Sequence, residues 1–273
     1  MTSATGKKGA TPIPAIKPSA LRTLSIYARE ARLEFVKMLR VPIYTISTLV
    51  FPLMFYVIFG LTFSNDTNAG ISAPTYMLAT YGAFGVIGCA LFGFGVAIAV
   101  ERGQGWMRLK RASPMPPAAY FSAKLAMAFL FSTVTILALF AMGALIADVR
   151  LPAATWLGLY GTLVAGSLPF SMMGLAFGYL LGPNSAPAVL NLVYLPMAFA
   201  SGLWIPIEFL PGFFTAIAPY LPPYHYAQLA LGQLGASQGG EPLIHLAVLA
   251  GYTLLFLVLA LVGYRRDEGN TYG

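Results

Sequence analysis

The chain has 273 residues, of which 58% are hydrophobic and only 9% are charged. This number of charged side chains is too small to cover a water-soluble globule of this size. The composition therefore excludes a soluble domain and indicates an integral membrane protein. The formal net charge of +7 could suit a nucleic-acid partner, but the basic residues gather beside apolar runs, where they indicate membrane topology instead.

Six apolar runs, each of about 20 residues and mostly without a charge, follow one another along the chain. A helix of about that length crosses a hydrocarbon core roughly 30 Å thick. The sequence therefore predicts an all-α integral membrane fold, with one six-span domain over residues 21–264. The expected spans are 41–63, 74–100, 125–147, 153–181, 186–204 and 243–264.

The residues before the first span divide into a tail and a helix. Residues 1–20 have the Pro, Gly, Ser and Lys content of a disordered tail. Over 21–40, apolar residues recur every three or four positions and the basic ones fall largely off that stripe, which predicts an amphipathic helix. Such a helix lies in the headgroup layer of the membrane; the alternative is a charged helix in solvent. The stripe consists of Leu21, Leu24, Ala28, Ala31, Phe35 and Met38.

The distribution of the basic residues predicts the orientation of the spans. If the chain crosses the membrane six times, fifteen of the sixteen Lys and Arg fall on one side and Arg150 alone falls on the other. Positively charged loops stay in the cytoplasm. We therefore expect both termini, including the tail 265–273, and the loop 101–119 to be cytoplasmic.

The loop 101–119 begins with the segment ERGQGWMRLKRASPMPP. The preference for positive charge in the cytoplasm explains the sign of its bases. It does not explain the helix-sized apolar insert among them, or the prolines that end the segment.

The connection 205–242 is too apolar and aromatic for an ordinary exposed loop, and its prolines interrupt it too often for a regular span. Short re-entrant helices in the outer leaflet would satisfy both facts, since irregular backbone is tolerated at membrane depth where protein covers it. Glu208 brings a charge into this region. It could be an outer gate, or a carboxylate at the exposed start of a helix.

The fourth span carries Gly174, Gly178 and Gly182 at intervals of four residues. These glycines form one smooth face on which another helix can pack closely. We interpret the pattern as a packing device and not as a functional site.

Several chemistries are missing from the sequence. The spans hold essentially no ionisable side chain apart from His245, whereas pumps and ion-coupled carriers place such groups in the membrane. Neither His225 nor His245 has the spacing or partners of a metal site. A phosphate-binding loop of the form GxxxxGK followed by Ser or Thr is absent, so any ATP that drives the protein must be bound by another polypeptide.

One alternative is a stand-alone membrane protein, either an intramembrane protease or an ion-coupled carrier. Ser167 and Ser171 lie in the fourth span and His245 lies in the sixth. Neither serine sits on the glycine-framed turn that such nucleophiles use, which disfavours the protease.

Three parts of the chain resemble the permeases of ABC type-2 exporters. Glu101, Arg102 and the following GQGWMRLKRASPMPP are similar to the family's loop between spans two and three, with its charged start, its short helix ending in Leu-Lys-Arg and its proline exit. The basic helix before the first span and the segment SGLWIPIEFLPGFFTAIAPYLPPYHYAQ before the sixth also resemble the family's pattern. With the six expected spans, the resemblance extends over nearly the whole chain.

The resemblance implies a permease without an ATP site, in a bacterial cytoplasmic (inner) membrane. Two copies would form a homodimer, and each would dock a cytoplasmic ATPase subunit that binds ATP and Mg; the chain itself would bind no cofactor, metal or nucleic acid. The loop would hold a coupling helix that inserts into the ATPase, with the amphipathic helix as a second contact. Trp106, Met107 and Leu109 would be its apolar anchors. The other implied coupling residues are Glu101, Arg102, Gly103, Arg108, Lys110 and Arg111.

In this family, spans one, two and five tend to face the export route. Here they offer aromatic and weakly polar side chains without charge, which suit a hydrophobic or amphipathic substrate such as a drug, antibiotic, lipid or lipid-linked glycan. The same side chains could equally pack one helix on another. They are Tyr44, Thr45, Thr48, Phe55, Tyr81, Phe84, Asn191, Tyr194 and Phe199.

Overall fold

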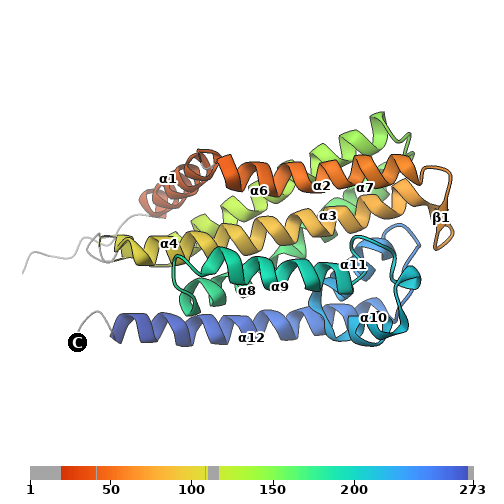
Figure 1. Cartoon of the computed structure of the whole chain (residues 1–273). Helices are drawn as coiled ribbons and strands as arrows, with labels where there is room; N and C mark the ends of the chain where they lie inside the picture. Colours follow the sequence, from red (N-terminus) through yellow and green to blue (C-terminus); the bar gives the residue numbers. More distant parts are fainter. Residues whose placement is uncertain (1–19, 41, 108, 110–116, 270–273) are drawn as a thin grey trace, which may run out of the picture.

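The structure, a computed structural model, describes residues 20–40, 42–107, 109 and 117–269. Within these ranges the only strands form one short antiparallel hairpin, and the expected all-α fold is confirmed (Figure 1). The first elements in chain order are α1 (Ala20–Leu39), α2 (Pro42–Thr62), β1 (Thr67–Asn68), β2 (Ile71–Ser72), α3 (Ala73–Leu91), η1 (Phe92–Val96) and α4 (Ala97–Gly103). They are followed by α6 (Pro117–Leu145), α7 (Ala153–Ala165), α8 (Ser167–Leu180), α9 (Ala186–Ala200), η2 (Ile207–Phe209), α10 (Gly212–Ile217), η3 (Ala218–Tyr220), α11 (Pro222–Gly232) and α12 (Pro242–Gly269).

Helices that are long and apolar enough to cross a membrane form the body of the molecule. Four such helices lie in the part of the chain that the structure describes, and two shorter apolar helices run beside them (Figure 1). Six crossings therefore stay a prediction. The four are Ala73–Gly103, Ala118–Leu145, Ala153–Leu180 and Pro242–Asp267, and the shorter two are Thr48–Thr62 and Ala186–Ala200.

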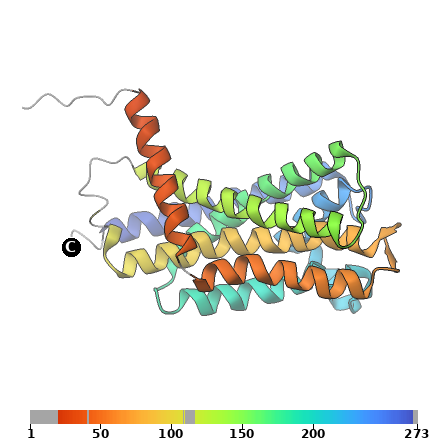
Figure 2. The ribbon, with the colours of Figure 1, turned by 90° about the horizontal axis from the view of Figure 1, so that it is seen from above.

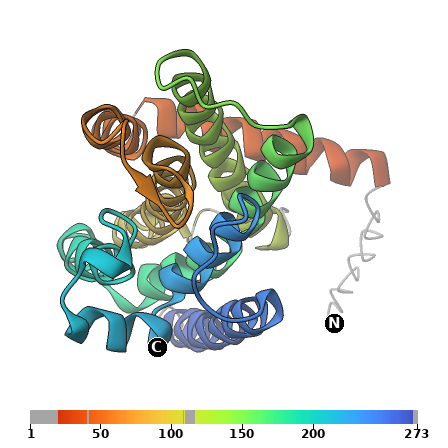
Figure 3. The same cartoon turned by 90° about the vertical axis from the view of Figure 1, so that its right-hand side faces the viewer.

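The continuous helix made of α3, η1 and α4 lies at the centre of the bundle. Every residue of α3 is buried, because its sequence is apolar on all sides and leaves no polar face for water. The helices α2, α6, α8 and α11 pack around α3, and Figure 3 views this arrangement along the bundle. The π-helical turn η1, with the sequence FGFGV, interrupts the helix; such turns occur often at functional sites.

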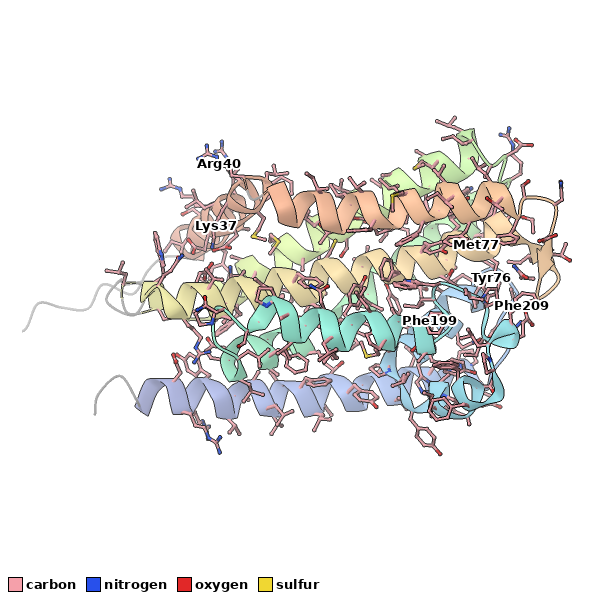
Figure 4. All side chains as sticks on the ribbon, viewed as in Figure 1. Lys37, Arg40, Tyr76, Met77, Phe199 and Phe209 are labelled. Carbon is pink, nitrogen blue, oxygen red and sulfur yellow. The ribbon has the colours of Figure 1, made fainter. Side chains whose placement is uncertain are left out.

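The two ends of the bundle differ in their segments and in their charge. The α1 end carries α1, the end of α4 and the C-terminal end of α12, whereas the α11 end carries the β-hairpin, α10 and α11 (Figure 1). Figure 4 places Lys37 and Arg40 at the α1 end and Tyr76 and Phe209 at the α11 end. In Figure 2, α1 lies across the bundle and not along it.

The outward faces of the long helices are apolar. On α12, the leucines and valines of the last turns before the charged end are exposed, among them Leu254, Val258 and Leu261. A contiguous apolar surface of this extent is typical of contact with lipid chains and not with water. The fold therefore agrees with the membrane protein expected from the composition.

The glycines of α8 confirm a close helix contact. A Cβ on Gly174 would lie 3.0 Å from the carbonyl oxygen of Leu91, and a Cβ on Gly178 would lie 2.9 Å from Cβ of Ile98. The α8 backbone therefore rests directly on the central helix. Gly182 lies beyond this contact, since its nearest neighbour is the Ser185 hydroxyl at 3.7 Å.

The helices include charged residues that the expected spans, with essentially no ionisable side chain, left outside their bounds. Glu101 and Arg102 fall within the candidate span Ala73–Gly103, and Lys124 falls within Ala118–Leu145. The helices continue past these residues, whereas the expected spans stopped at the first charge. The physical reason is that each of these charges has a partner of opposite sign.

The segment between α9 and α12 is built from the short helical turns η2, α10, η3 and α11. A proline precedes η2 and α10, and prolines lie in the first turns of η3 and α11, as in many helices. The short helices were expected; their position within a bilayer stays a prediction.

Candidate functional site

Five side chains form a buried network at the α1 end, which we call the charged cluster. Lys124 donates from Nζ to Glu34 Oε2 and to Glu101 Oε1, both at 2.7 Å. Lys37 also donates to both carboxylates, and the Tyr120 hydroxyl donates to Glu101 Oε2 at 2.6 Å. Lys124 is 0% exposed and Glu101 is 5% exposed, so these charges interact with one another and hardly with water.

Three helices bring the charged cluster together. Glu34 and Lys37 are three residues apart on α1 and so lie on one face, and Tyr120 and Lys124 are four apart on α6 and do the same. Glu101 comes from α4. The cluster therefore joins the helix before the first span, the end of the central helix and the start of α6.

Apolar contacts hold α1 on α6 beside the charged cluster. The rings of Phe35 and Phe131 have centroids 5.2 Å apart, and Met38 is buried in the same small core. Phe35 and Met38 belong to the predicted apolar stripe of α1, whereas Ala28, another residue of that stripe, is exposed. The side chains of Leu21 and Leu24 lie outside the described residues. The inner face of α1 is thus partly apolar and partly charged.

The charge balance of the cluster makes its burial tolerable. Its two lysines oppose two carboxylates, whereas an unpaired charge would cost several kcal/mol in the same place. Burial alone would lower the pKa of Lys37, but the nearby carboxylates of Glu101 and Glu34 outweigh it and raise the pKa above its ordinary value. Lys37 is therefore protonated throughout the physiological pH range.

A second set of contacts fastens the next residue of α4 to the other side of the bundle. Arg102 Nη2 lies 2.8 Å from Asp267 Oδ1 near the end of α12. Its Nη1 donates to the Gly178 carbonyl of α8 at 2.8 Å, and its guanidinium carbon lies 5.2 Å from the centroid of the Tyr179 ring. Glu101 and Arg102, both predicted to couple to an ATPase, thus hold the end of α4 from two sides within this chain.

The chain leaves α4 through a tight turn that needs glycine. A Cβ on Gly103 would lie 2.5 Å from Pro183 Cγ. Gly105 has a φ of +76°, in the left-handed region that other residues rarely adopt. A larger residue at either position would therefore clash or strain the turn.

The three predicted apolar anchors differ in what they contact. Met107 is 8% exposed and packs in the core formed with Tyr120 and Tyr179. Trp106 and Leu109 are 52% and 67% exposed, so a large apolar surface stands free at the α1 end. The other predicted coupling residues, Arg108, Lys110 and Arg111, lie outside the described residues.

The predicted substrate-path residues include five rings of a larger aromatic group, and the sequence analysis missed other members, among them Trp204, Phe59 and Phe92. Phe84 stacks on Tyr194 with centroids 5.0 Å apart, and the Tyr81 hydroxyl donates to the Trp204 carbonyl at 3.0 Å. Figure 4 places Phe199 toward the α11 end. The group includes Phe55, Tyr81, Phe84, Tyr194, Phe199 and Trp204.

The predicted substrate-path residues differ in how deeply they are buried. Tyr81, Phe84 and Tyr194 are in the core, so within one chain they pack α3 against α9 and the turn after it. Asn191 is exposed and donates to the Pro187 carbonyl at 3.0 Å, whereas Thr48 is buried. Two further residues of the predicted path, Tyr44 and Thr45, have side chains outside the described residues.

Glu208 lies in the first turn of η2 and is exposed. Gln238 donates to its Oε2 from Nε2 at 2.9 Å. This placement corresponds to the exposed helix-start carboxylate, the alternative to an outer gate.

The serines considered for proteolysis are not joined to a histidine. Ser167 donates to the Val164 carbonyl at 2.7 Å, and the buried Ser171 hydroxyl has no hydrogen-bond partner in the described ranges. His245 instead lies 2.8 Å from His225, measured between the Nδ1 atoms. The described residues therefore offer no Ser-His relay.

The charged cluster was missed because its contacts between α1, α4 and α6 join residues that are 19 to 90 positions apart in the sequence. The available signal was the pair of carboxylates, Glu30 and Glu34, on a helix that is otherwise mostly basic and apolar. An acid on such a helix is a reason to search for a buried base.

Comparison of the sequence with known proteins identifies the family to which the chain belongs. The family model described as ABC-2 type transporter matches residues 30–234, a range that contains the whole charged cluster and the turn after α4. The chain belongs to the ABC-2 type transporter family. This ABC-2 type permease is also 26% identical over 248 residues to a Bacillus subtilis (strain 168) protein named "Putative transport permease YvfS", covering 90% of this chain and 99% of that one.

Membership fixes the class of the protein. It is a multi-pass membrane permease of an ABC transporter, and partnership with ATPase subunits follows from the family. Such a permease normally has no ATPase site of its own.

Proposed function

We propose that this permease moves a hydrophobic or amphipathic substrate out of the cell as a homodimer with two separate ATPase subunits. Drugs, antibiotics, lipids and lipid-linked glycans are the substrate classes that fit. The ATPase subunits carry ATP and Mg. The family and the relative of B. subtilis support the transport role. The direction rests on the resemblance of the loop 101–119 to that of ABC type-2 exporters, and the substrate class rests on the aromatic, uncharged character of α2, α3 and α9.

The observation that carries the coupling proposal is the pair of exposed apolar side chains, Trp106 and Leu109, directly after the fastened end of α4. An exposed Trp beside bases is typical of the centre of a protein interface. Because Glu101 and Arg102 join the end of α4 to α1, α6, α8 and α12, a push on this turn would reach most of the bundle. The ATPase therefore acts at Trp106 and Leu109, and the charged cluster distributes the motion.

The orientation of the protein follows from charge. Lys37 and Arg40 lie at the α1 end with the C-terminal end of α12 (Figures 1 and 4), whereas Arg150 forms an exposed pair with Asp148 at 2.6 Å after α6 has crossed the bundle. The α1 end therefore faces the cytoplasm of a bacterial cell, with both termini inside. The α11 end faces outward.

The exposed apolar face of α2 supports the homodimer. Val50, Phe51, Met54 and Ile58 are exposed within one chain, and Leu192 of α9 is 74% exposed. A second copy that covered α2 and α9 would place the aromatic group near the line between the two copies. The substrate would pass along that line.

Changing Trp106 and Leu109 together to alanine should weaken the association of the ATPase roughly thirtyfold, the loss typical of an interface hot spot of about 2 kcal/mol. Tagged permease is purified from membranes of its native cells, and the co-purifying ATPase activity is measured per permease. The matched control is Gln104→Ala, because Gln104 is exposed in the same turn but is polar. Equal ATPase recovery with the double variant and the control would rule out docking at these side chains.

A further inference from the structure

The two histidines of the protein meet in a buried contact at the α11 end. His225 is on α11 and His245 is in the first turns of α12, and they are 4% and 3% exposed. Their Nδ1 atoms are 2.8 Å apart. The Nε2 atom of His225 lies 2.8 Å from the Pro219 carbonyl oxygen, and that of His245 contacts the Gly239 carbonyl oxygen.

These contacts determine how many protons the pair holds. A carbonyl oxygen can only accept, so both Nε2 atoms carry a hydrogen. The Nδ1 atoms can approach to 2.8 Å only if one donates to the other, which requires a third hydrogen between them. A pair of neutral imidazoles holds two hydrogens. The pair in this geometry therefore holds one proton more and carries one positive charge.

We propose that His225 and His245 form a proton-binding site that fastens α11 to α12 by one shared proton. Loss of that proton leaves two lone pairs facing each other, and gain of another leaves two N–H groups facing each other. Either change removes the hydrogen bond. The α11 end is therefore tightest at intermediate pH and loosens on both sides of it.

The acid side of this dependence agrees with the surroundings of His225. Burial lowers the pKa of His225, and the imidazole of His245 lowers it further, against the opposing hydrogen bond to Pro219. A histidine with a lowered pKa in the packed state is more easily protonated when separated. Its contribution to packing is thus present above the ordinary value of about 6.5 and is lost as the pH falls through the lowered value. On the alkaline side, the shared proton exists only in the packed pair, so packing is lost as the pH rises through its release.

The neighbouring groups do not supply the same response. Histidine is the side chain whose ordinary pKa lies between about pH 5 and 8, and burial raises the pKa of Tyr224, whose ring is next to both imidazoles. A change in this range therefore acts on the pair. The titratable side chains on the elements around it include Tyr76 and Tyr81 of α3, Tyr160 of α7, Tyr220 of η3, Tyr224 and Tyr226 of α11 and Tyr252 of α12, with Glu208 and Glu241 in the flanking segments.

Nuclear magnetic resonance of the ring nitrogens counts the protons directly. Because the protein contains two histidines, ¹⁵N-labelled histidine in permease reconstituted in lipid nanodiscs gives four ring-nitrogen signals. Between about pH 6 and 8 we expect three protonated nitrogens and one unprotonated Nδ1, with this pattern lost at lower and at higher pH. The proposal would be overturned if the signals showed two neutral rings, with both Nδ1 atoms unprotonated, between about pH 6 and 8.

Hydrogen exchange tests the consequence for the fold. Exchange of backbone amides in residues 212–240 is compared between the protein and the variant His225→Gln/His245→Gln at each pH, which cancels the intrinsic pH dependence of exchange. Relative to the variant, we expect the unchanged protein to exchange at least about tenfold more slowly at intermediate pH, and this protection to vanish at both extremes. The β-hairpin 67–72 at the same end serves as the internal reference. A ratio that is constant with pH would contradict the proposal, and the nitrogen signals decide it alone if the variant fails to fold.

Discussion

Replacing Lys124 by methionine is expected to lower the free energy of unfolding by about 3–5 kcal/mol, the cost of removing one partner from a buried ion pair. Lys124 is 0% exposed and donates to both Glu34 and Glu101 at 2.7 Å. Methionine fills a similar volume but leaves the two carboxylates to share Lys37, which is 44% exposed on its side chain. The measurement is unfolding by denaturing detergent in mixed micelles.

A matched variant separates charge from packing. Glu34→Gln/Glu101→Gln/Lys124→Met removes both acids and the buried base, and so leaves only Lys37 charged in the cluster, with a side chain that is 44% exposed and reaches water. We expect it to recover most of the stability lost by Lys124→Met, because neutral replacements of a buried ion group are often tolerated. If the single and the triple variants were equally unstable, the loss would come from packing around residue 124 and not from the ion pairs.

The same pair of variants tests transmission. If the charged cluster passes motion from the turn after α4 to α1 and α6, the triple variant should bind the ATPase normally but transport less substrate per ATP hydrolysed. Stability and coupling are then separated, since the triple variant is stable and uncoupled. Normal transport by a stable triple variant would limit the cluster to a structural role.

The sequence predicted the long elements because they depend on local pattern. An apolar run of about 20 residues is helical in a membrane whatever surrounds it, and the helix over 21–40 was visible from its spacing alone. The stripe that identified this helix included Phe35 and Met38, which do face inward. The spacing of that stripe could not indicate that Glu34 also faces inward. Glu34 does so because it accepts a hydrogen bond from Lys124, which is 90 residues away in the sequence.

Long-range contacts account for the other differences. Met107 and Leu109 are equally apolar in the sequence, and only the position of Tyr120 and Tyr179 makes Met107 a core residue and leaves Leu109 exposed. Similarly, His225 and His245 have no metal-like spacing, and they meet because α11 folds back onto α12. The sequence contained these residues but not the distances between them.

Enlarging Gly174 should destabilise the protein in steps. Gly174→Ala places a Cβ 3.0 Å from the Leu91 carbonyl oxygen and 3.0 Å from Phe94 Cβ, a contact tighter than most, so we expect a small loss. Gly174→Leu cannot fit unless α8 moves away from the central helix, and we expect a loss of about 1–3 kcal/mol as for other overpacked cores. Movement of α8 would also draw the Gly178 carbonyl away from Arg102.

Gly161 provides the matched control because a Cβ there meets nothing within 4 Å. Gly161→Ala and Gly161→Leu add the same atoms and the same helix propensity on α7, in the same candidate span. They should leave the free energy of unfolding unchanged or raise it slightly. Equal stabilities for Gly174→Leu and Gly161→Leu in the same detergent titration would mean that α8 does not rest on the central helix. If only the Gly174 variants lower the free energy of unfolding, the contact between α8 and the central helix is the one that tolerates no added side chain. This contact lies beside the hydrogen bond from Arg102 to Gly178.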